Sequence, residues 1–214
     1  MVTSRIAKLA SELEKLYRDR SAEMLFHGWH HISFVAKKAV SFAEEFDVDK
    51  ELIEAAALTH DLNYIVESNS EPEAGKDLRA KYLSEAGFLP GEIAEIDALV
   101  MEEHTSTRHA HISDSAKALN DADTLFKALP ITPILFAGHY ITENHTDIRK
   151  LASKVVGEQK PLMEQDIYFY TKAAKTKYSD WAIVNLKLWE NVMAALDDND
   201  VEEMLLIART LKVI

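Results

Sequence analysis

The sequence predicts an all-α protein, organised as a helical bundle. Apolar residues recur at the three- and four-residue spacing of a helix in one segment after another along the 214-residue chain. No segment sustains the alternation of apolar and polar residues that marks a half-buried strand. Helix-stopping residues separate the periodic segments, as at Gly87, Pro90 and Pro130. Together these observations make the helix the repeating element of the fold.

Three helices are expected in the N-terminal part of the chain. The first spans residues 4–20, and Gly28 separates it from a second helix over 30–46. Asp49 is a typical N-cap for the third helix, because its carboxylate can accept the free backbone N–H groups of a first turn. This helix is apolar and ends near residues 60–61, on a histidine followed by an aspartate.

The middle of the chain continues with helices joined by polar loops. One of these helices carries an apolar stripe that ends on His104, and another can be capped by Ser113 or Asp114. The expected elements are a loop over 63–72 and helices over 73–86, 91–105 and 114–129.

The C-terminal third is expected to hold further helices after Pro130 and Pro133 break the chain. Trp181 and Trp189 lie eight residues apart, at helical spacing, and are expected in the core. The expected helices are a short apolar one over 133–141, then 147–158, 161–178, 179–196 and a last one from 201 onward.

Composition excludes several kinds of site and partner. The chain has no cysteine, which excludes disulfides, thiolate zinc sites and cysteine nucleophiles. Its formal charge is −12, so neither a nucleic-acid polymer nor an anionic membrane is expected as the main partner. No apolar run approaches the roughly 18–20 residues of a membrane span, and the sequence opens without a signal pattern. We therefore expect a cytoplasmic protein with a small ligand; a homo-oligomer remains open.

Four polar side chains are predicted to face the core near helix ends. His31 lies at the start of the buried face of the second helix, His60 continues the apolar stripe of the third, and Asp61 follows directly. Asp123 interrupts the apolar face of the 114–129 helix. Buried ionisable groups without partners are costly. One shared divalent metal would satisfy all four, because imidazole and carboxylate are common metal ligands.

The segment that holds Asp123 carries a second aspartate, Asp121. On a helix the two residues lie about 200° apart, so they point to opposite sides. Lys117 precedes Asp121 by one turn, which indicates the solvent side. We therefore expect Asp123 to be buried and Asp121 to be exposed, in at most a surface pair with Lys117.

The segments around these residues resemble a known family. In their order along the chain they are similar to the HD superfamily of metal-dependent phosphohydrolases, and in particular to a bacterial subgroup with HGxxH, HD, H[ST]x[ST] and DADxL motifs. The resemblance covers about Leu25 to Leu129 and implies one HD-type all-α domain over 1–214, with the metal-site core at 25–129 and the helices of 130–214 packed on it. The segments read HGWHH (27–31), LTHD (58–61), HTST (104–107) and DADTL (121–125).

The resemblance also implies a site and a reaction. The site would bind one divalent ion (Mn, Mg, Fe, Co, Ni or Zn) and hydrolyse a small phosphate ester or anhydride, with nucleotides among the candidates. Asp61, His27 and His104 are the implied catalytic residues, and the two histidines could stabilise phosphoryl charge or protonate the leaving group. The implied metal ligands are His31, His60, Asp61 and Asp123.

Departures from the family pattern leave two other functions open. Some HD nucleotidases carry a glutamate three residues after the His-Asp aspartate, where this chain has Tyr64. A catalytically silent module that binds a ligand is therefore one alternative, unless Glu67, Glu71 or Glu73 substitutes. An iron-dependent oxygenase is the other. Dinuclear HD proteins insert two separated histidines before the last aspartate, and residues 62–103 contain none, which favours one metal.

Six of the other histidines divide into two groups. For His27 and His104, a structural role in the core or at a helix end is as good an interpretation as a catalytic one. Four others are expected on the surface or in loops, namely His109, His111, His139 and His145.

Overall fold

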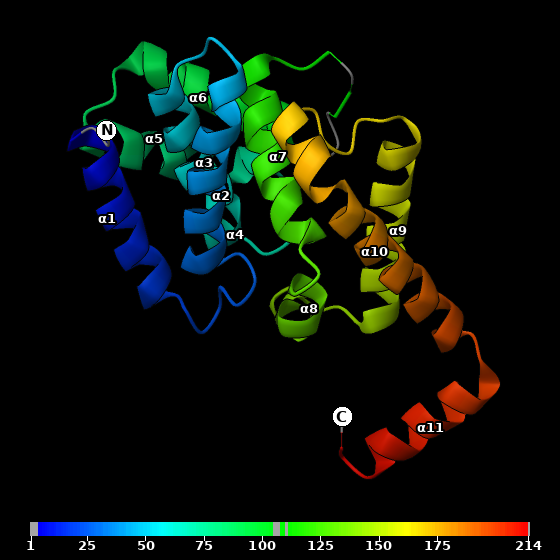
Figure 1. Ribbon diagram of the computed structural model, residues 1–214. Helices are drawn as coiled ribbons and strands as arrows, with labels where there is room; N and C mark the ends of the chain where they lie inside the picture. The colour runs from blue at the N-terminus through cyan, green and yellow to red at the C-terminus, as the bar shows by residue number, and fades with distance from the viewer. Residues whose placement is uncertain (1–3, 105–107, 110, 214) are drawn as a thin grey trace.

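The computed structural model describes residues 4–104, 108–109 and 111–213, and every regular element within them is helical, which confirms the all-α prediction (Figure 1). Two short 3-10 turns, η1 (Ala43–Glu45) and η2 (Pro72–Gly75), lie between longer helices. The α-helices are α1 (Ser4–Asp19), α2 (Trp29–Phe42), α3 (Lys50–Thr59), α4 (Leu62–Val66), α5 (Lys76–Ala86), α6 (Pro90–Glu103), α7 (Asp114–Ala128), α8 (Thr132–Glu143), α9 (Ile148–Glu164), α10 (Lys172–Leu196) and α11 (Asn199–Thr210).

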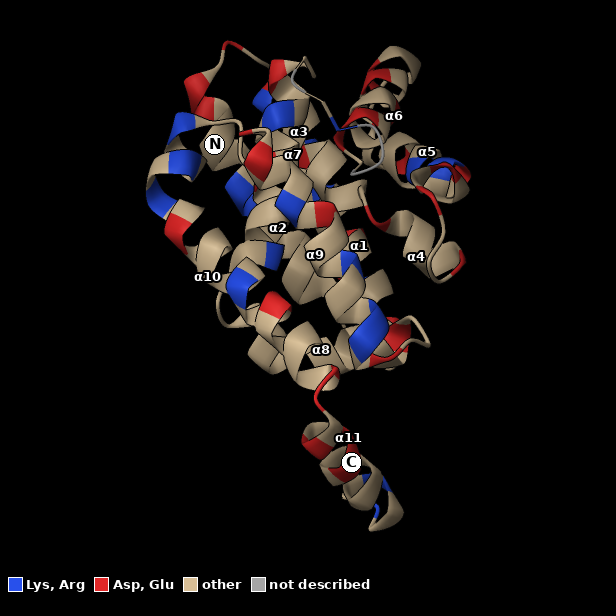
Figure 2. Ribbon diagram, turned by 90° about the vertical axis from the view of Figure 1, so that its right-hand side faces the viewer, with Lys and Arg blue, Asp and Glu red and all other residues tan. Residues whose placement is uncertain are grey.

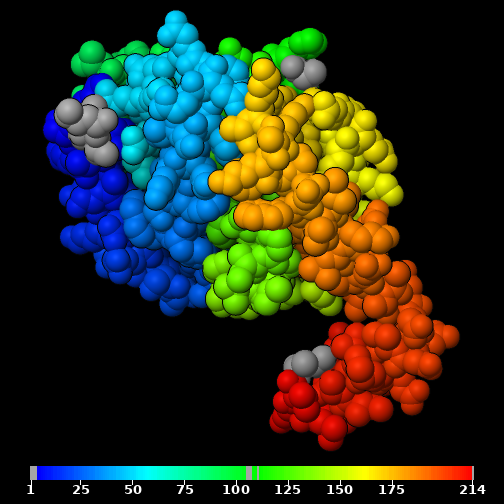
Figure 3. Space-filling view, viewed as in Figure 1, coloured from blue at the N-terminus to red at the C-terminus, as the bar shows by residue number. Residues whose placement is uncertain are grey.

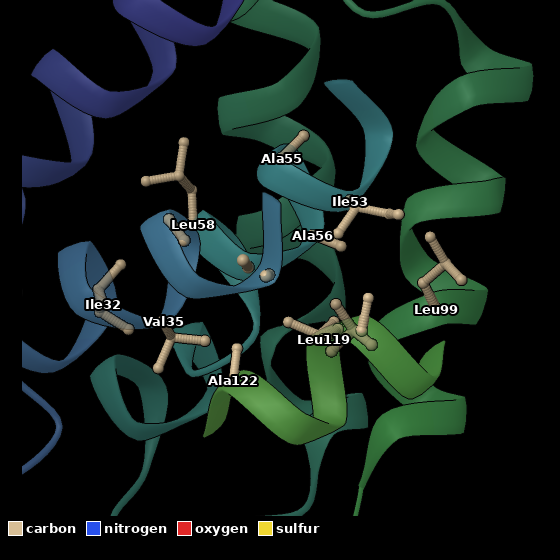
Figure 4. Packing of buried hydrophobic residues seen from close by; sticks show 14 of the residues in the cluster. Ile32, Val35, Ile53, Ala55, Ala56, Leu58, Leu99, Leu119 and Ala122 are labelled. Carbon is tan, nitrogen blue, oxygen red and sulfur yellow. The ribbon is translucent and has the colours of Figure 1, made fainter. Parts of the chain in front are cut away.

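The core lies where α2, α3, α6 and α7 pack together (Figure 4). Val35 from α2, Ile53 from α3 and Leu119 from α7 are fully buried there. Alanines fill much of α3, so the neighbouring helices can approach it closely. Burial of a Leu or Ile side chain contributes about 1.5–3 kcal/mol, so this contact region supplies much of the stability around the site.

Local signals at helix ends behave as the sequence predicts. Asp49 caps α3 by accepting the backbone N–H groups of Glu51 and Leu52. Ser113 caps α7 in the same way through the N–H of Ala116. Gly87 ends α5 in the left-handed region, at φ 100°, where a side chain would be strained. Two of these caps fix the starts of helices near the site, because α3 leads to His60 and α7 carries Asp123.

Several expectations about individual segments and residues are wrong. Residues 62–66 form α4, although a loop was expected over 63–72. Helix α9 continues through Pro161, which removes one backbone hydrogen bond but does not end the helix. Helix α10 has no break at residues 178–179, because its buried stripe runs continuously through Tyr178 and Ala182. Trp181 lies off that stripe and is exposed, whereas Trp189 is buried as expected.

Helix α11 extends from the end of α10, away from the rest of the protein (Figures 1 and 3). None of its residues is buried, and large apolar side chains such as Met204, Leu206 and Ile207 are exposed. Within the described residues, no helix combines the length and hydrophobicity needed to cross a membrane. Basic and acidic residues are interspersed on the face of the molecule shown in Figure 2.

Removal of residues 199–214 should leave the stability of the remaining helices almost unchanged. Because α11 buries no side chain, its loss exposes little new apolar surface. Thermal unfolding should show a midpoint within about 2 °C of the full chain. Truncation after Val184, which also removes the buried Leu186 and Trp189, should by contrast lower the midpoint clearly. A comparable loss in both truncations would show that α11 supports the fold.

Candidate metal centre

Two histidines and one aspartate converge at the centre of the helical core. His31 comes from the first turn of α2, His60 is the C-cap residue of α3, and Asp61 lies between α3 and α4. The Nε2 atoms of the two histidines are 3.2 Å apart. Asp61 Oδ2 lies 3.0 Å from Nε2 of His31 and 3.2 Å from Nε2 of His60. Such a group of ligand atoms could hold a metal ion.

Local backbone structure places each ligand. Gly28 precedes α2 in a tight turn, where an added Cβ would lie 2.5 Å from the carbonyl oxygen of Met24. A larger residue would therefore move the start of α2 and His31 with it. His60 is oriented by its Nδ1, which donates to the carbonyl oxygen of Ala57 at 2.8 Å. This bond leaves Nε2 of the neutral ring free to bind a metal, as in many metal-binding histidines.

Asp123 lies beside this cluster on α7. Its Oδ1 is 3.5 Å from Nε2 of His31, and its Oδ2 accepts a hydrogen bond of 2.6 Å from Lys127 one turn later. Burial alone would raise the pKa of Asp123, but the charge of Lys127 outweighs this and lowers it. Asp123 is buried as predicted, and its carboxylate lies next to His31, one of the three clustered ligands.

The chemistry of the four side chains fits a divalent metal. Two ligand atoms that share one ion at about 2.1 Å lie about 3 Å apart, which matches the spacing among His31, His60 and Asp61. Asp61 Oδ2 is buried and has no hydrogen-bond partner with good geometry among the described residues. Two facing imidazole nitrogens and a poorly satisfied carboxylate are costly without a cation between them. A divalent ion would remove all of these costs.

The pKa values of the cluster show the same demand for positive charge. Burial lowers the pKa of His31. It would also lower that of His60, but the carboxylate of Asp61 outweighs burial and raises the pKa of His60 to about 9. Burial opposes ionisation of Asp61 as well, yet the two histidines hold its pKa well below the usual value. Near neutral pH the cluster therefore carries one added proton, on His60, at the place where a divalent metal would contribute two positive charges.

A cavity of about 510 Å³ opens from this cluster, a size that suits a small ligand. The side nearest the cluster is lined by His60, Asp61 and Asp123. The C-terminal helices also line the cavity, with apolar side chains such as Leu151 of α9 and Trp189 of α10 and charged ones such as Lys154 and Glu158. The cavity thus has a charged end beside the cluster and a mixture of apolar and charged side chains elsewhere.

His27 and His104, the two histidines with an implied catalytic role, both line this cavity. His104 is the C-cap residue of α6, with a side chain that is 32% exposed, and its Nδ1 lies 3.5 Å from Oε2 of Glu71. The rest of the HTST segment, residues 105–107, lies outside the described residues. His27 is buried in the turn before α2, where its ring stacks on Tyr64 with 3.7 Å between ring centroids. His109, His111, His139 and His145 are exposed, as expected.

The expectation that Asp121 faces solvent is wrong. Its side chain is fully buried and accepts hydrogen bonds from the backbone N–H groups of Tyr170 and Thr171 and from the Thr171 hydroxyl. Burial raises the pKa of Asp121 to about 6, although these hydrogen bonds oppose the shift. Periodicity failed here because α7 is covered on both sides, by α2 and α6 on one and by the start of α10 on the other. Asp121 thus anchors α10.

Sequence reasoning also missed three ionisable residues near the cluster. Glu103, the last residue of α6, is buried against the cavity, where burial and then the charge of Asp123 raise its pKa to about 7. It shares the apolar stripe of Ile96 and Val100, a signal that the sequence did contain. Lys127 follows Asp123 by four residues and could have been found in the same way. Glu143 gives no such signal.

Comparison with known proteins identifies the family of the central segment. Residues 28–127 match the family model of the HD domain, so this segment of the chain belongs to the HD-domain family. The segment contains all four predicted metal ligands, and the family assignment made from the sequence is confirmed. Proteins of this family bind divalent metals. The assignment to a bacterial subgroup with four motifs stays a prediction.

Two solved structures share the fold along most of the chain. The crystal structure of Bacillus subtilis YpgQ in complex with ADP has 18% sequence identity and a TM-score of 0.56, and the match covers 92% of this chain and 99% of that one. The crystal structure of Bacillus subtilis YpgQ has the same identity and a TM-score of 0.55, over 90% and 99%. A search of curated proteins found no match.

Proposed function

We propose that this protein is a metal-dependent phosphohydrolase acting on a small phosphate ester or anhydride. The observation that carries the proposal is the convergence of His31, His60 and Asp61, with Asp123 beside them, at the charged end of a ligand-sized cavity. A nucleotide is the substrate class that we favour. Its phosphates suit the charged end, its base suits apolar lining residues such as Leu151 and Trp189, and ADP is bound by YpgQ, which shares the fold.

The three clustered ligands and the neighbouring Asp123 would hold one divalent ion, and the HD family supports this assignment. When bound, such an ion lowers the pKa of water and offsets phosphoryl charge. The protein supplies the rest. Lys127 adds a cation at the same end of the cavity, which matters because a chain of charge −12 otherwise repels an anion. His104 can donate to phosphoryl oxygens or to the leaving group from the cavity wall, and His27 can do so from Nε2 when its ring carries a second proton.

We also propose that residues 130–214 form one functional unit with the HD segment. Asp121 of α7 receives three hydrogen bonds from residues 170–171, and α10 packs on α7, which supports a single domain. The same C-terminal helices line part of the cavity. A cytoplasmic reaction fits the absence of cysteine from the sequence.

A screen of phosphate esters and nucleotides tests the proposal. The purified chain is reconstituted with Mn²⁺, Mg²⁺, Co²⁺ or Fe²⁺, and phosphate or pyrophosphate release is measured. We expect release that depends on the metal and is lost with chelator. Tight ligand binding without any release under every metal would favour a silent binding module. Oxygen consumption with Fe²⁺ in place of hydrolysis would favour an oxygenase.

His104→Ala should lower turnover by about a hundredfold and leave metal content unchanged. The reason is that His104 lines the cavity but is not among the three clustered ligands. Turnover and metal content are measured on the same preparation. His111→Ala, an exposed histidine seven residues later, is the matched control and should behave like the parent. Loss of metal from His104→Ala would show that His104 is itself a ligand and that the site is not the one proposed.

A further inference from the structure

Glu143, the last residue of α8, reaches from outside the HD segment into the turn that carries His27. Its carboxylate is buried, and both of its oxygens form hydrogen bonds with residues of this turn. Oε2 accepts the backbone N–H of Phe26 at 2.6 Å and that of His27 at 3.2 Å. Oε1 pairs with Nδ1 of the His27 ring. One side chain thus holds both the backbone and the imidazole of a residue that lines the cavity.

The remaining contacts of His27 hold its ring in one orientation. Tyr64 stacks on one face, with planes only 10° apart, and Phe26 meets the ring edge-on at 4.9 Å between centroids. The ring centroid lies 6.0 Å from that of His31, one of the clustered ligands. Tyr64 occupies the position where some HD nucleotidases carry a glutamate, so this chain uses that position to support a histidine.

The hydrogen-bond pattern determines which nitrogen of His27 carries the proton. An ionised carboxylate can only accept, so a hydrogen bond between Glu143 and Nδ1 requires a proton on Nδ1. Burial alone would raise the pKa of Glu143, but its bonds to His27 and to the two backbone N–H groups lower it, which keeps the carboxylate ionised. In the neutral ring, Nε2 is then the nitrogen that remains to act in the cavity.

We propose that Glu143 is a positioning residue that fixes the tautomer and orientation of His27, so that Nε2 faces the bound phosphorylated substrate. The assignment of a role in turnover rests on the proposed function, whereas the assignment of the tautomer does not. A carboxylate on α8 would in this way link the C-terminal helices to the chemistry of the HD segment. A carboxylate that orients a histidine through Nδ1 is an effective arrangement in acid–base sites.

Glu143→Gln gives a sharp test because of the two backbone donors. The amide has one oxygen, and the N–H groups of Phe26 and His27 require it at the position of Oε2. The NH₂ group must then face Nδ1 of His27, which can only accept from it. The neutral ring is thereby forced to carry its proton on Nε2. Substitution should therefore switch the tautomer without removing the hydrogen bond.

Nitrogen-15 NMR of the metal-free full chain reads the tautomer directly, at about pH 9–10, where most imidazole rings are neutral. The His27 signals are assigned by their absence in His27→Ala. We expect the Nδ1–H tautomer in the parent and the Nε2–H tautomer in Glu143→Gln. Glu143→Asp keeps an acceptor-only group and should retain Nδ1–H. An Nε2–H tautomer in the parent would overturn the proposal even if no variant folds, and so would an unchanged tautomer in folded Glu143→Gln.

Kinetics on a metal-loaded preparation test the role in turnover. Glu143→Gln should lower kcat by about tenfold or more, with metal content and KM near the parent values. In a His27→Ala background the same exchange should change kcat by less than about twofold, because Glu143 acts through His27. Glu95→Gln, an exposed acid on α6, should match the parent. An equal loss in both backgrounds would show that Glu143 only supports the fold. A parent without turnover would refute the proposed function and leave the tautomer result standing.

Discussion

Replacing Asp61 with alanine should abolish metal binding and reduce turnover to background. Asp61 is the only carboxylate in the group of three clustered ligands, and its Oδ2 lies within 3.2 Å of both histidine nitrogens. Without it, a divalent ion would face two neutral imidazoles and lose its nearest anion. A ligand at a hundredfold excess over its Kd stabilises the folded state by about 2.7 kcal/mol. The unfolding midpoint of the parent should therefore rise with added metal, and that of Asp61→Ala should not.

The measurement is thermal unfolding with chelator and with added Mn²⁺ or Co²⁺. Asp77→Ala, an exposed aspartate on α5, is the control and should show the full metal-dependent rise. Chelator should lower the midpoint of the parent and of the control by the same amount. A metal-dependent rise in Asp61→Ala equal to that of the parent would place the ion elsewhere.

Asp121→Ala should destabilise the protein severely. The substitution removes one buried carboxylate and leaves three donors of residues 170–171 without an acceptor. Each unsatisfied buried group costs about 1–3 kcal/mol, so we expect a loss of about 3–5 kcal/mol. For a chain of this size that lowers the unfolding midpoint by about 10 °C. Urea unfolding at the same pH gives the free-energy difference.

Asp114→Ala is the matched control, because Asp114 lies on the same helix but its side chain is 51% exposed in a surface pair with Lys117. It should cost no more than about 0.5 kcal/mol. Folded Asp121→Ala should still bind metal, whereas Asp123→Ala should fold and bind it weakly. If Asp121→Ala lost metal while keeping the stability of the parent, Asp121 would be a ligand and not an anchor for α10.

The sequence predicted those parts of the fold that depend on local signals. Ile6, Leu9 and Leu13 line one face of α1 and are buried, as their spacing indicates. Helices α3 and α7 begin at the N-caps Asp49 and Ser113, and α5 ends at Gly87, as expected. Such caps could be predicted because they act within a few residues of the chain. The join at residues 178–179 was not predicted correctly. Packing of α10 against α7 and α9 keeps that helix continuous, and such contacts leave no local signature.

The candidate site shows the same division. His31, His60 and Asp61 could be predicted because polar residues at the ends of buried stripes are conspicuous, and the structure brings them together. The burial of Asp121 could not be predicted, because it depends on α10, which begins some fifty residues later. Glu143 was missed for a related reason. It ends an apolar helix, and only the folded chain brings that end to the turn at Phe26 and His27.

Metal analysis of the full chain tests the central claim most directly. Parent, His60→Ala and His111→Ala are stripped with chelator, reconstituted with Mn²⁺ or Co²⁺, desalted and analysed for metal and protein together. A site built on His31, His60, Asp61 and Asp123 predicts about one ion per chain in the parent and in His111→Ala, and almost none in His60→Ala. An equal metal content in all three, or no retained metal in the reconstituted parent, would contradict it.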